Sequence, residues 1–522
     1  MVITGARIQT LDRGTPLASV LAVAGGRIIY VGEDATACLG PGTRHIDAHG
    51  ASIVPGLIDS HVHMESLGEQ LETFDLRNVK AVAEVAAIVK SAAAGRKPGE
   101  WIRGRAWDQT NWGGQFPAAD DLEAAAPANP VYLVRVDGHA AWVNRQALRI
   151  AGVAAETPDP PGGRILRGPA GVPTGILIDN AQDLVARRIP PATFEETRRR
   201  IARAAHECVR LGLTTVHDAG VAPPQLEAYR DLIARHELPV RVYAMIGGTG
   251  GLWREYLRRG PETGDRLTVR AVKLIADGAL GSRGAALLAP YADEPGNTGL
   301  LLLTREQIEK TAREAMAHGF QVATHAIGDR ANRTVLEAYA AALGGANGHR
   351  FRIEHAQVVA PADFELFRRY SIVASIQATH ATSDMRWAQA RLGPDRLQGA
   401  YAWRRFLSLG VPLANGSDFP VEDPNPLLGF YAAITRQDRN GNPPAGWLPE
   451  QRMTREEALE SWTLGGAYAA FEEDRKGSLA PGKLADFVML SADIMTIPPR
   501  QIPATRVQMT VVGGEVVYSD AR

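Results

Sequence analysis

Two histidines stand one residue apart in the segment PGLIDSHVHM, as His61 and His63. On a β-strand, side chains two residues apart point to the same face, so both imidazoles would project together. A neutral imidazole is a good ligand for zinc and similar metals. Alone the pair is a weak signal, because two histidines at this spacing also occur by chance.

Three further segments contain residues that can bind a metal. THAIGD contains His325, IEHAQ contains His355 and NGSDFP contains Asp418. Each follows an apolar run, and each alone is more often an ordinary structural residue. If these runs are barrel strands, the side chains meet at the carboxyl end of the barrel. Four histidines and one aspartate buried together need a cation between them, so the sequence predicts a metal centre.

Lys273 lies inside the apolar segment VRAVKLIADGAL. A lysine within a buried strand is costly unless it is paired or modified. One interpretation is an ion pair with a neighbouring carboxylate such as Asp277. The other is a carbamylated lysine, whose anionic oxygens would bind two metals at once.

Strand-like apolar runs alternate with helical stretches through the middle of the chain, which is typical of a parallel α/β fold. One such helical stretch, TREQIEKTAREAMAHG, precedes the fifth run. Eight parallel strands with crossover helices form a TIM (β/α)8 barrel, which is the fold we expect. The eight strands are expected near residues 56–63, 213–219, 240–246, 269–276, 320–327, 351–357, 371–377 and 411–418.

The two ends of the chain resemble each other. VAGGRIIYV near the start and VVGGEVVYS near the end both consist of a strand, a Gly-Gly turn and a second strand, which predicts two hairpins. We expect residues 1–55 and 474–522 to form one β-sandwich jointly. Residues 56–473 would form the barrel domain between them.

The connection between the first two expected strands covers residues 64–212, far more than a βα connection needs. We expect an inserted subdomain that leaves the catalytic end of the barrel and acts as a lid or substrate wall. Trp107 and Trp112 would line it, because aromatic side chains are common in ligand pockets. The alternative is an elaboration of the scaffold, with the tryptophans as its core.

Composition excludes several classes of function. The chain has 522 residues, with 57 basic and 58 acidic side chains and a net charge of −1, so no nucleic-acid footprint is present. No run of about 18 apolar residues exists, so we expect no membrane span. The only cysteines, Cys38 and Cys208, are far apart, which fits a reducing, cytoplasmic environment. A cleaved leader peptide and assembly into a homo-oligomer both stay open.

These segments together resemble the amidohydrolase superfamily, which carries an HxH pair, a strand-four lysine, two later histidines and a strand-eight aspartate. Further segments resemble its amidohydrolase 3 branch, typified by N-substituted formamide deformylases. They are GRAWDQTNW, DGHAAWVN, PTGILIDNA, HDAG, KLIADGALGSRGAAL, THAIGDRAN, RIEHAQ, GSDFPVEDPNPLLG and, near the C-terminus, GSLAPGKLADFVML. The resemblance spans nearly the whole chain.

The resemblance implies a divalent metal site with two ions per chain, or one, and with zinc as the first expectation. The implied ligands are His61, His63, Lys273, His325, His355 and Asp418. The first two histidines and the aspartate would hold the more buried ion, and the other two histidines the second. A carbamate on Lys273 would bridge both ions. A bridging hydroxide would be the nucleophile, and Asp418 would carry its proton to the leaving amine.

The implied reaction is hydrolysis of a C–N bond in an exocyclic amide, an N-substituted formamide or a carbamate of a small molecule. One alternative is a cyclic amide hydrolase or a deaminase of the same superfamily, although a deaminase does not require Lys273. Another is a non-catalytic barrel that serves as a scaffold, in which lost ligands would be expected. Further residues could contact substrate or be purely structural, and these are His139, His217, Asp277 and Arg283.

Overall fold

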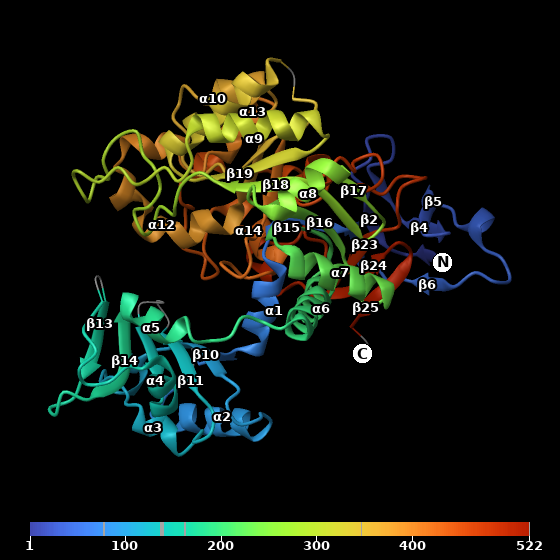
Figure 1. Ribbon diagram of the computed structural model, residues 1–522. Helices are drawn as coiled ribbons and strands as arrows, with labels where there is room; N and C mark the ends of the chain where they lie inside the picture. The colour runs from blue at the N-terminus through green and yellow to red at the C-terminus, as the bar shows by residue number, and fades with distance from the viewer. Residues whose placement is uncertain (77–78, 136–139, 161–162, 346, 521–522) are drawn as a thin grey trace. The chain divides into compact units, whose positions relative to one another are not determined.

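The computed structural model describes residues 1–76, 79–135, 140–160, 163–345 and 347–520. The chain divides into two compact units (Figure 1). One consists of Met1–Leu67 together with Thr197–Arg522, and the other of Gly68–Glu196. Within the described residues, no helix is both long and apolar enough to cross a membrane.

Eight parallel strands form the barrel of the first unit, as the sequence predicts. Each strand pairs with the next barrel strand along the chain, from β8 to β22. Most of their side chains are buried, which explains why the strands read as continuous apolar runs in the sequence. The strands are β8 (Leu57–Val62), β15 (Leu213–Val221), β16 (Arg241–Gly247), β18 (Leu267–Ile275), β19 (Gln321–Ala326), β20 (Arg352–His355), β21 (Val373–Gln377) and β22 (Leu413–Gly416).

Two backbone hydrogen bonds join the segment after the last strand to the first strand. The amide of Asp418 donates to the carbonyl of His61 over 2.8 Å, and the amide of His63 donates to the carbonyl of Phe419 over 2.9 Å. Gly416 permits this approach, because a Cβ there would lie 2.7 Å from the amide nitrogen of His61. The carboxyl end of the barrel is therefore closed where His61 and Asp418 meet.

Helices connect the barrel strands, as in other barrels of this kind. The predicted helical stretch before the fifth strand is α9 (Arg305–Ala317). It starts with a capping box, in which Thr304 and Gln307 each bond the other's backbone amide. The other helices of this unit are α6 (Phe194–Arg210), α7 (Pro223–Ala234), α8 (Gly251–Arg259), α10 (Asp329–Leu343), α11 (Phe364–Arg369), α12 (Ala378–Leu392), α13 (Trp403–Ser408), α14 (Pro426–Thr435), α15 (Arg455–Ser461) and α16 (Leu464–Ala469).

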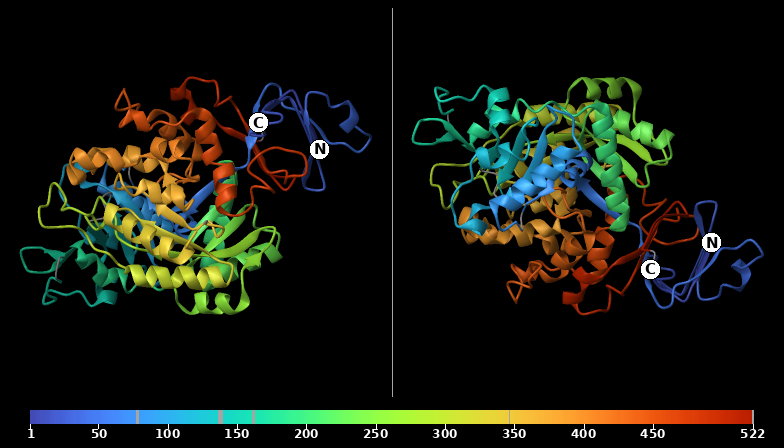
Figure 2. Two further views of the ribbon diagram at one scale, coloured as in Figure 1. Left: turned by 90° about the horizontal axis from the view of Figure 1, so that it is seen from above. Right: turned by 90° about the horizontal axis from the view of Figure 1, so that it is seen from below.

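Strands from both ends of the chain form a β-sandwich, as the sequence predicts, and the two termini lie on the same side of the barrel (Figure 2). One sheet has the order β5-β4-β1-β6 and the other β25-β24-β23-β7-β2-β3. Strand β7 pairs antiparallel with β23, with Ile53 opposite Met489. The strands are β1 (Val2–Thr4), β2 (Arg7–Gln9), β3 (Leu17–Ala18), β4 (Val20–Ala24), β5 (Arg27–Gly32), β6 (His45–Asp47), β7 (Ser52–Pro55), β23 (Phe487–Leu490), β24 (Val507–Val512) and β25 (Glu515–Ser519).

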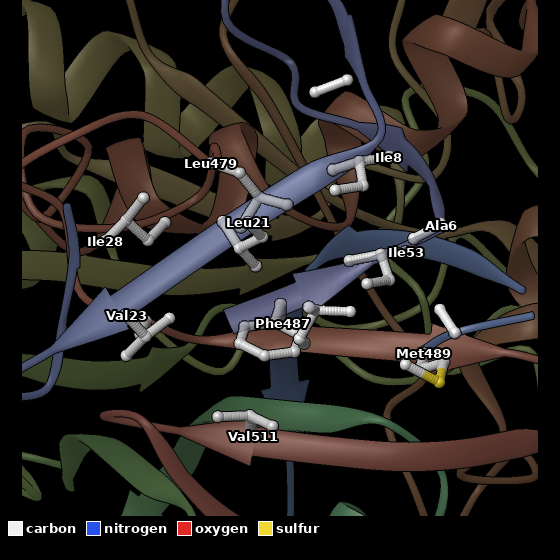
Figure 3. Packing of buried hydrophobic residues seen from close by; sticks show 14 of the residues in the cluster. Ala6, Ile8, Leu21, Val23, Ile28, Ile53, Leu479, Phe487, Met489 and Val511 are labelled. Atoms are coloured by element: carbon white, nitrogen blue, oxygen red, sulfur yellow. The ribbon is translucent and has the colours of Figure 1, made fainter. Parts of the chain in front are cut away.

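Buried side chains from both termini fill the space between the two sheets (Figure 3). Leu21 and Ile53 come from the N-terminal segment, and Phe487 and Val511 come from the C-terminal one. Neither segment could bury this apolar surface alone, so each supplies part of the core that stabilises the other.

The second unit has its own six-stranded sheet, in the order β13-β14-β12-β11-β10-β9. Helix α1 (Met64–Glu72) leads into it from β8. Helix α6 returns the chain to the barrel, and its buried Cys208 lies 3.9 Å from the sulfur of Met64. The elements of this unit are β9 (Phe74–Asp75), α2 (Val82–Ala94), β10 (Ile102–Trp107), α3 (Asp120–Glu123), β11 (Val131–Arg135), β12 (Ala140–Val143), α4 (Arg145–Ala151), β13 (Gly163–Arg167), β14 (Pro173–Asp179) and α5 (Asp183–Ala186).

Tryptophans form part of the core of this second unit. Trp107 and Trp142 are fully buried, with ring centroids 6.1 Å apart, and the indole nitrogen of Trp107 donates to the carbonyl of Leu133. Trp112 is half-buried and stacks on Trp107. The expectation that Trp107 lines a substrate wall is therefore wrong, because its ring is fully buried in the core of this unit. Trp112 packs at the edge of the same core.

Replacing Trp107 by Ala should destabilise the protein rather than change its substrate choice. Removing a buried indole leaves a cavity, and such changes cost about 3–5 kcal/mol. Urea unfolding followed by circular dichroism should show this loss, with a smaller loss for the half-buried Trp112→Ala. An unchanged unfolding midpoint together with a raised KM for bulky substrates would contradict the assignment.

Candidate metal centre

The carboxyl ends of the barrel strands bring the six predicted ligands to one region. All parallel strands end on the same side of the barrel, so residues at their ends become neighbours. His61 lies in β8 and His63 directly after it, while Lys273 lies in β18. The others are His325 in β19, His355 at the end of β20 and Asp418 just after β22.

His61, His63 and Asp418 form one group of donor atoms. Oδ1 of Asp418 lies 3.7 Å from Nε2 of His61 and 3.2 Å from Nε2 of His63. One ligand atom from each of the three lies within 4.8 Å of the others. Ligand atoms around a tetrahedral zinc ion lie roughly 3.4 Å apart, given bonds of about 2.0–2.2 Å. The spacing of this group therefore suits one ion.

The other ring nitrogen of each of these histidines is held by the barrel. Nδ1 of His61 contacts Oε2 of Glu354, and Nδ1 of His63 lies 2.9 Å from the carbonyl oxygen of Ala219. Such acceptors place the imidazole proton on Nδ1 and leave the Nε2 lone pair free for a metal. These contacts therefore orient both imidazole rings for metal binding.

Glu354 belongs to a buried network of charges that the sequence analysis missed. The guanidinium of Arg352 binds its carboxylate and also donates to the carbonyl of Ser60 and to Oγ of Ser375, over 2.6 and 2.7 Å. Burial opposes ionisation of Glu354, but Arg352 and His61 outweigh it and hold the pKa of Glu354 well below its usual value. The signal was present in RIEHAQ, where two charged residues alternate within a strand.

His355 and His325 lie together on the other side of the site. Their ring centroids are 4.5 Å apart, and the ring of His355 is 4.9 Å from that of His61. Nδ1 of His355 lies 2.7 Å from Oε1 of Gln377. His325 and His355 therefore lie beside the group formed by His61, His63 and Asp418, as a two-ion site would require.

Two of these residues have an unusual backbone. The φ angles are +73° at His355 and +59° at Asp418, in the left-handed region that favours glycine. For other residues such conformations cost of order 1–3 kcal/mol and cluster at functional sites. Here they turn two ligand side chains toward the centre at the points where β20 and β22 end.

A third histidine beside this group was also missed from the sequence. His380 lies in the first turn of α12, three residues after β21 ends. Its Nε2 is 3.7 Å from Oδ2 of Asp418, and its ring stacks on His355 with centroids 5.9 Å apart. Its position just past the seventh strand was the available signal, because that is the functional end of the barrel.

Lys273 is buried within β18, as the sequence predicts. Burial lowers the pKa of its ammonium group, against the raising effect of Glu354 and Asp418. The ion pair with Asp277 is not formed, because the Asp277 carboxylate accepts instead from the backbone amides of Ala286, Ile327 and Gly328 over 2.8–3.0 Å.

The protonation states at neutral pH suit metal binding. Burial lowers the pKa of His61 to about 4 and that of His325 to about 3, so both imidazoles are neutral. Burial alone would raise the pKa of Asp418, but the adjoining His63, with Nε2 3.2 Å from Oδ1, together with His61 and His380 brings it to about 2. Neutral imidazole and ionised carboxylate are the ligand forms.

Several buried atoms of the centre have no hydrogen-bond partner within the described residues. They are Oδ1 of Asp418 and Nε2 of His325 and His380. A buried polar atom without a partner is costly, and divalent cations bound at the centre would satisfy these atoms. A set of imidazole nitrogens and carboxylate oxygens fits zinc, manganese, cobalt or iron.

Of the four polar residues expected to contact substrate, the structure describes His217, Asp277 and Arg283. His139 lies outside the described residues. His217 is fully buried, with Nδ1 3.0 Å from the guanidinium of Arg352, so it is an interior residue and does not line a pocket as expected. Asp277, also fully buried, shapes the loops after β18 and β19 through its three backbone contacts.

Arg283 lies in the long loop after β18, before α9. Its guanidinium pairs with Asp293 and Glu294 of the same loop, at 3.1 and 3.3 Å. A role for Arg283 in binding substrate therefore stays a prediction.

Removing the partner of His355 should weaken metal binding without unfolding the protein. Changing Gln377 to Leu leaves Nδ1 of His355 without its 2.7 Å contact. Outer-shell losses of this kind typically cost about 10–100-fold in metal affinity. Competition with a coloured chelator would measure the change, and Gln389→Leu on the exposed side of α12 is the control. Equal affinity in both variants would show that Gln377 does not orient the ligand.

Comparisons with known proteins find similar proteins over nearly the whole chain. The profile of the amidohydrolase family matches residues 44–518. The chain is 38% identical to the Arabidopsis thaliana protein LONG AFTER FAR-RED 3, over 99% of this chain and 91% of that protein. It is 26% identical to the N-substituted formamide deformylase of Arthrobacter pascens, over 99% of this chain and 98% of the enzyme. The crystal structure of an uncharacterized metal-dependent hydrolase from Pyrococcus furiosus matches with a TM-score of 0.79 and 28% identity, covering 95% of this chain and 99% of that one.

Proposed function

Because this chain belongs to the amidohydrolase family, we propose that it hydrolyses the C–N bond of an exocyclic amide, an N-substituted formamide or a carbamate in a small molecule. The observation that carries this proposal is the cluster of imidazoles around Asp418, with donor atoms left unpaired in a buried site. The full-length similarity to a formamide deformylase supports the substrate class.

The residues of the first donor group, His61, His63 and Asp418, would hold one divalent ion, and His325 and His355 would contribute to a second. Zinc is the metal we propose, because imidazole and carboxylate ligands suit it. A divalent ion at this site supplies an activated water at neutral pH and polarises the scissile carbonyl.

Asp418 would move the proton in this reaction. Its carboxylate is ionised at neutral pH, and Oδ1 has no hydrogen-bond partner in the described structure. It would accept a proton from the attacking water and deliver it to the leaving nitrogen as the C–N bond breaks. The products are a carboxylic acid, or a carbonic acid monoester from a carbamate, and a free amine.

Lys273 would carry a carbamate when both ions are bound. Its burial favours the neutral amine, and the neutral amine is the form that adds to carbon dioxide. The resulting anion would replace an ammonium group that otherwise faces two cations, an unfavourable like-charge arrangement. This modification is part of the proposal.

A cavity of about 270 Å³ is lined partly by residues that lie close in the sequence to His380 and Asp418. Its lining includes Thr379, next to His380, and Glu422, four residues after Asp418. Leu428 and Tyr431 of α14 add apolar surface. We propose that the cavity receives the substituent on the amide nitrogen, since mixed apolar and polar linings are typical of ligand sites.

Assays with a substrate series and the Asp418→Asn variant test the proposed reaction. Wild-type protein loaded with zinc should release amine from N-substituted formamides faster than it opens lactams or deaminates heterocycles. Asp418→Asn keeps an oxygen ligand but cannot accept the proton, so kcat should fall by about 10²–10⁴-fold. Preference for a cyclic amide or a heterocyclic amine would contradict the proposal, as would an Asn variant with unchanged kcat.

Replacing Lys273 by Ala should remove the bridging anion. We expect the variant to lose its second ion while keeping the one held by the first donor group. Added formate or acetate should partly restore the second ion by placing a carboxylate where the carbamate stood. Metal analysis of dialysed protein gives the stoichiometry, and two firmly bound ions in Lys273→Ala would refute the bridging role.

A further inference from the structure

His380 faces the centre from the first turn of α12, directly after β21, a strand that carries none of the six predicted ligands. Its side chain is only 11% exposed. Within the described part of the chain Nε2 has no hydrogen-bond partner, and it lies 3.7 Å from Oδ2 of Asp418, too far for a hydrogen bond. A buried nitrogen that faces a carboxylate oxygen without bonding to it leaves room for a third atom between them.

The separation between these two atoms fits a shared cation. Two ligand atoms on a tetrahedral zinc ion lie roughly 3.4 Å apart. Nε2 of His61 lies at the same 3.7 Å from the other oxygen of Asp418. Each oxygen of this carboxylate therefore faces an imidazole nitrogen at ligand-to-ligand distance.

His355 completes a second group of donors. Ligand atoms of His355, His380 and Asp418 lie within 4.8 Å of one another, and all three residues are buried. The rings of His355 and His380 are nearly parallel, at 21°. The two groups share only Asp418, through opposite oxygens.

We propose that His380 is a direct ligand of the second ion, which it shares with His355 and Oδ2 of Asp418. Asp418 then bridges the two ions, in addition to the bridge proposed for Lys273. This inference rests on the proposed metal-dependent function and adds to it a ligand from the helix that follows the seventh strand. The competing role, in which His380 only contacts Asp418, predicts at most the roughly 10–100-fold loss of metal affinity that is typical of outer-shell changes.

One other acidic side chain, that of Asp384 one helical turn further along α12, interacts electrostatically with His380. Its carboxylate accepts from the hydroxyl of Tyr401 over 2.7 Å and from the amide of Gln357 over 3.2 Å. Among the described residues, the carboxylate oxygen at ion-pair distance from Nε2 of His380 is Oδ2 of Asp418.

Metal analysis of His380→Gln distinguishes the two roles. A glutamine amide can still donate a hydrogen bond to Asp418 but is a poor zinc ligand. After dialysis against buffered zinc, wild type should hold two ions per chain and His380→Gln one. Loss of a direct ligand should weaken the second ion by more than the roughly 10–100-fold typical of outer-shell changes. His206→Gln, at an exposed site on α6, is the matched control and should keep two ions.

Two ions in His380→Gln, or saturation of wild type at one ion, would overturn this inference while leaving hydrolysis by the first donor group intact. Wild type that binds no metal would contradict the proposed function as well. A measurement on unmodified protein guards against a variant that does not fold. Anomalous diffraction from zinc-loaded crystals should place an ion within bonding distance of Nε2 of His380, and an ion bound elsewhere would refute the assignment.

Discussion

The closing of the barrel between its first and last strands is the constraint on which the candidate centre depends. Asp418 and His61 are joined by a backbone hydrogen bond, and His63 is joined to Phe419. Without these contacts, the carboxylate that faces both donor groups would have no defined distance to the histidines. The absence of a side chain at Gly416 lets the two segments approach this closely. Sterics at one residue therefore help to set the geometry of the centre.

Electrostatics inside the barrel then prepare the ligands. Arg352 and Glu354 form a fully buried ion pair, and Glu354 in turn contacts the ring of His61. A buried pair of this kind adds little stability against an apolar replacement, but it orients its neighbours. The same burial that keeps His61 neutral makes an unpaired donor atom costly. A site built in this way favours a cation, because a cation satisfies the donors that the protein leaves unpaired.

The tryptophan content of the second unit does not by itself show whether these side chains bind substrate or stabilise the fold. Aromatic residues concentrated in an insertion can equally well line a pocket or fill a core. Trp107 fills the core of the second unit and bonds the carbonyl of Leu133. The first unit contains the donor atoms and a cavity whose lining includes Thr379, the residue before His380. Its sandwich is completed only when the two ends of the chain pair.

The amino-acid sequence by itself determined the fold class, the eight strands and six ligand candidates, because periodicity and strand ends are local patterns. His325, for example, could be recognised from the apolar run that precedes it. Only the tertiary structure decided which side chains share a partner. His380 and Glu354 belong to the centre because they contact Asp418 and His61, which are distant from them in the sequence. His217 contacts Arg352 in the interior and does not line a pocket. Such choices depend on side-chain directions and distances in three dimensions, which no spacing along a single chain encodes.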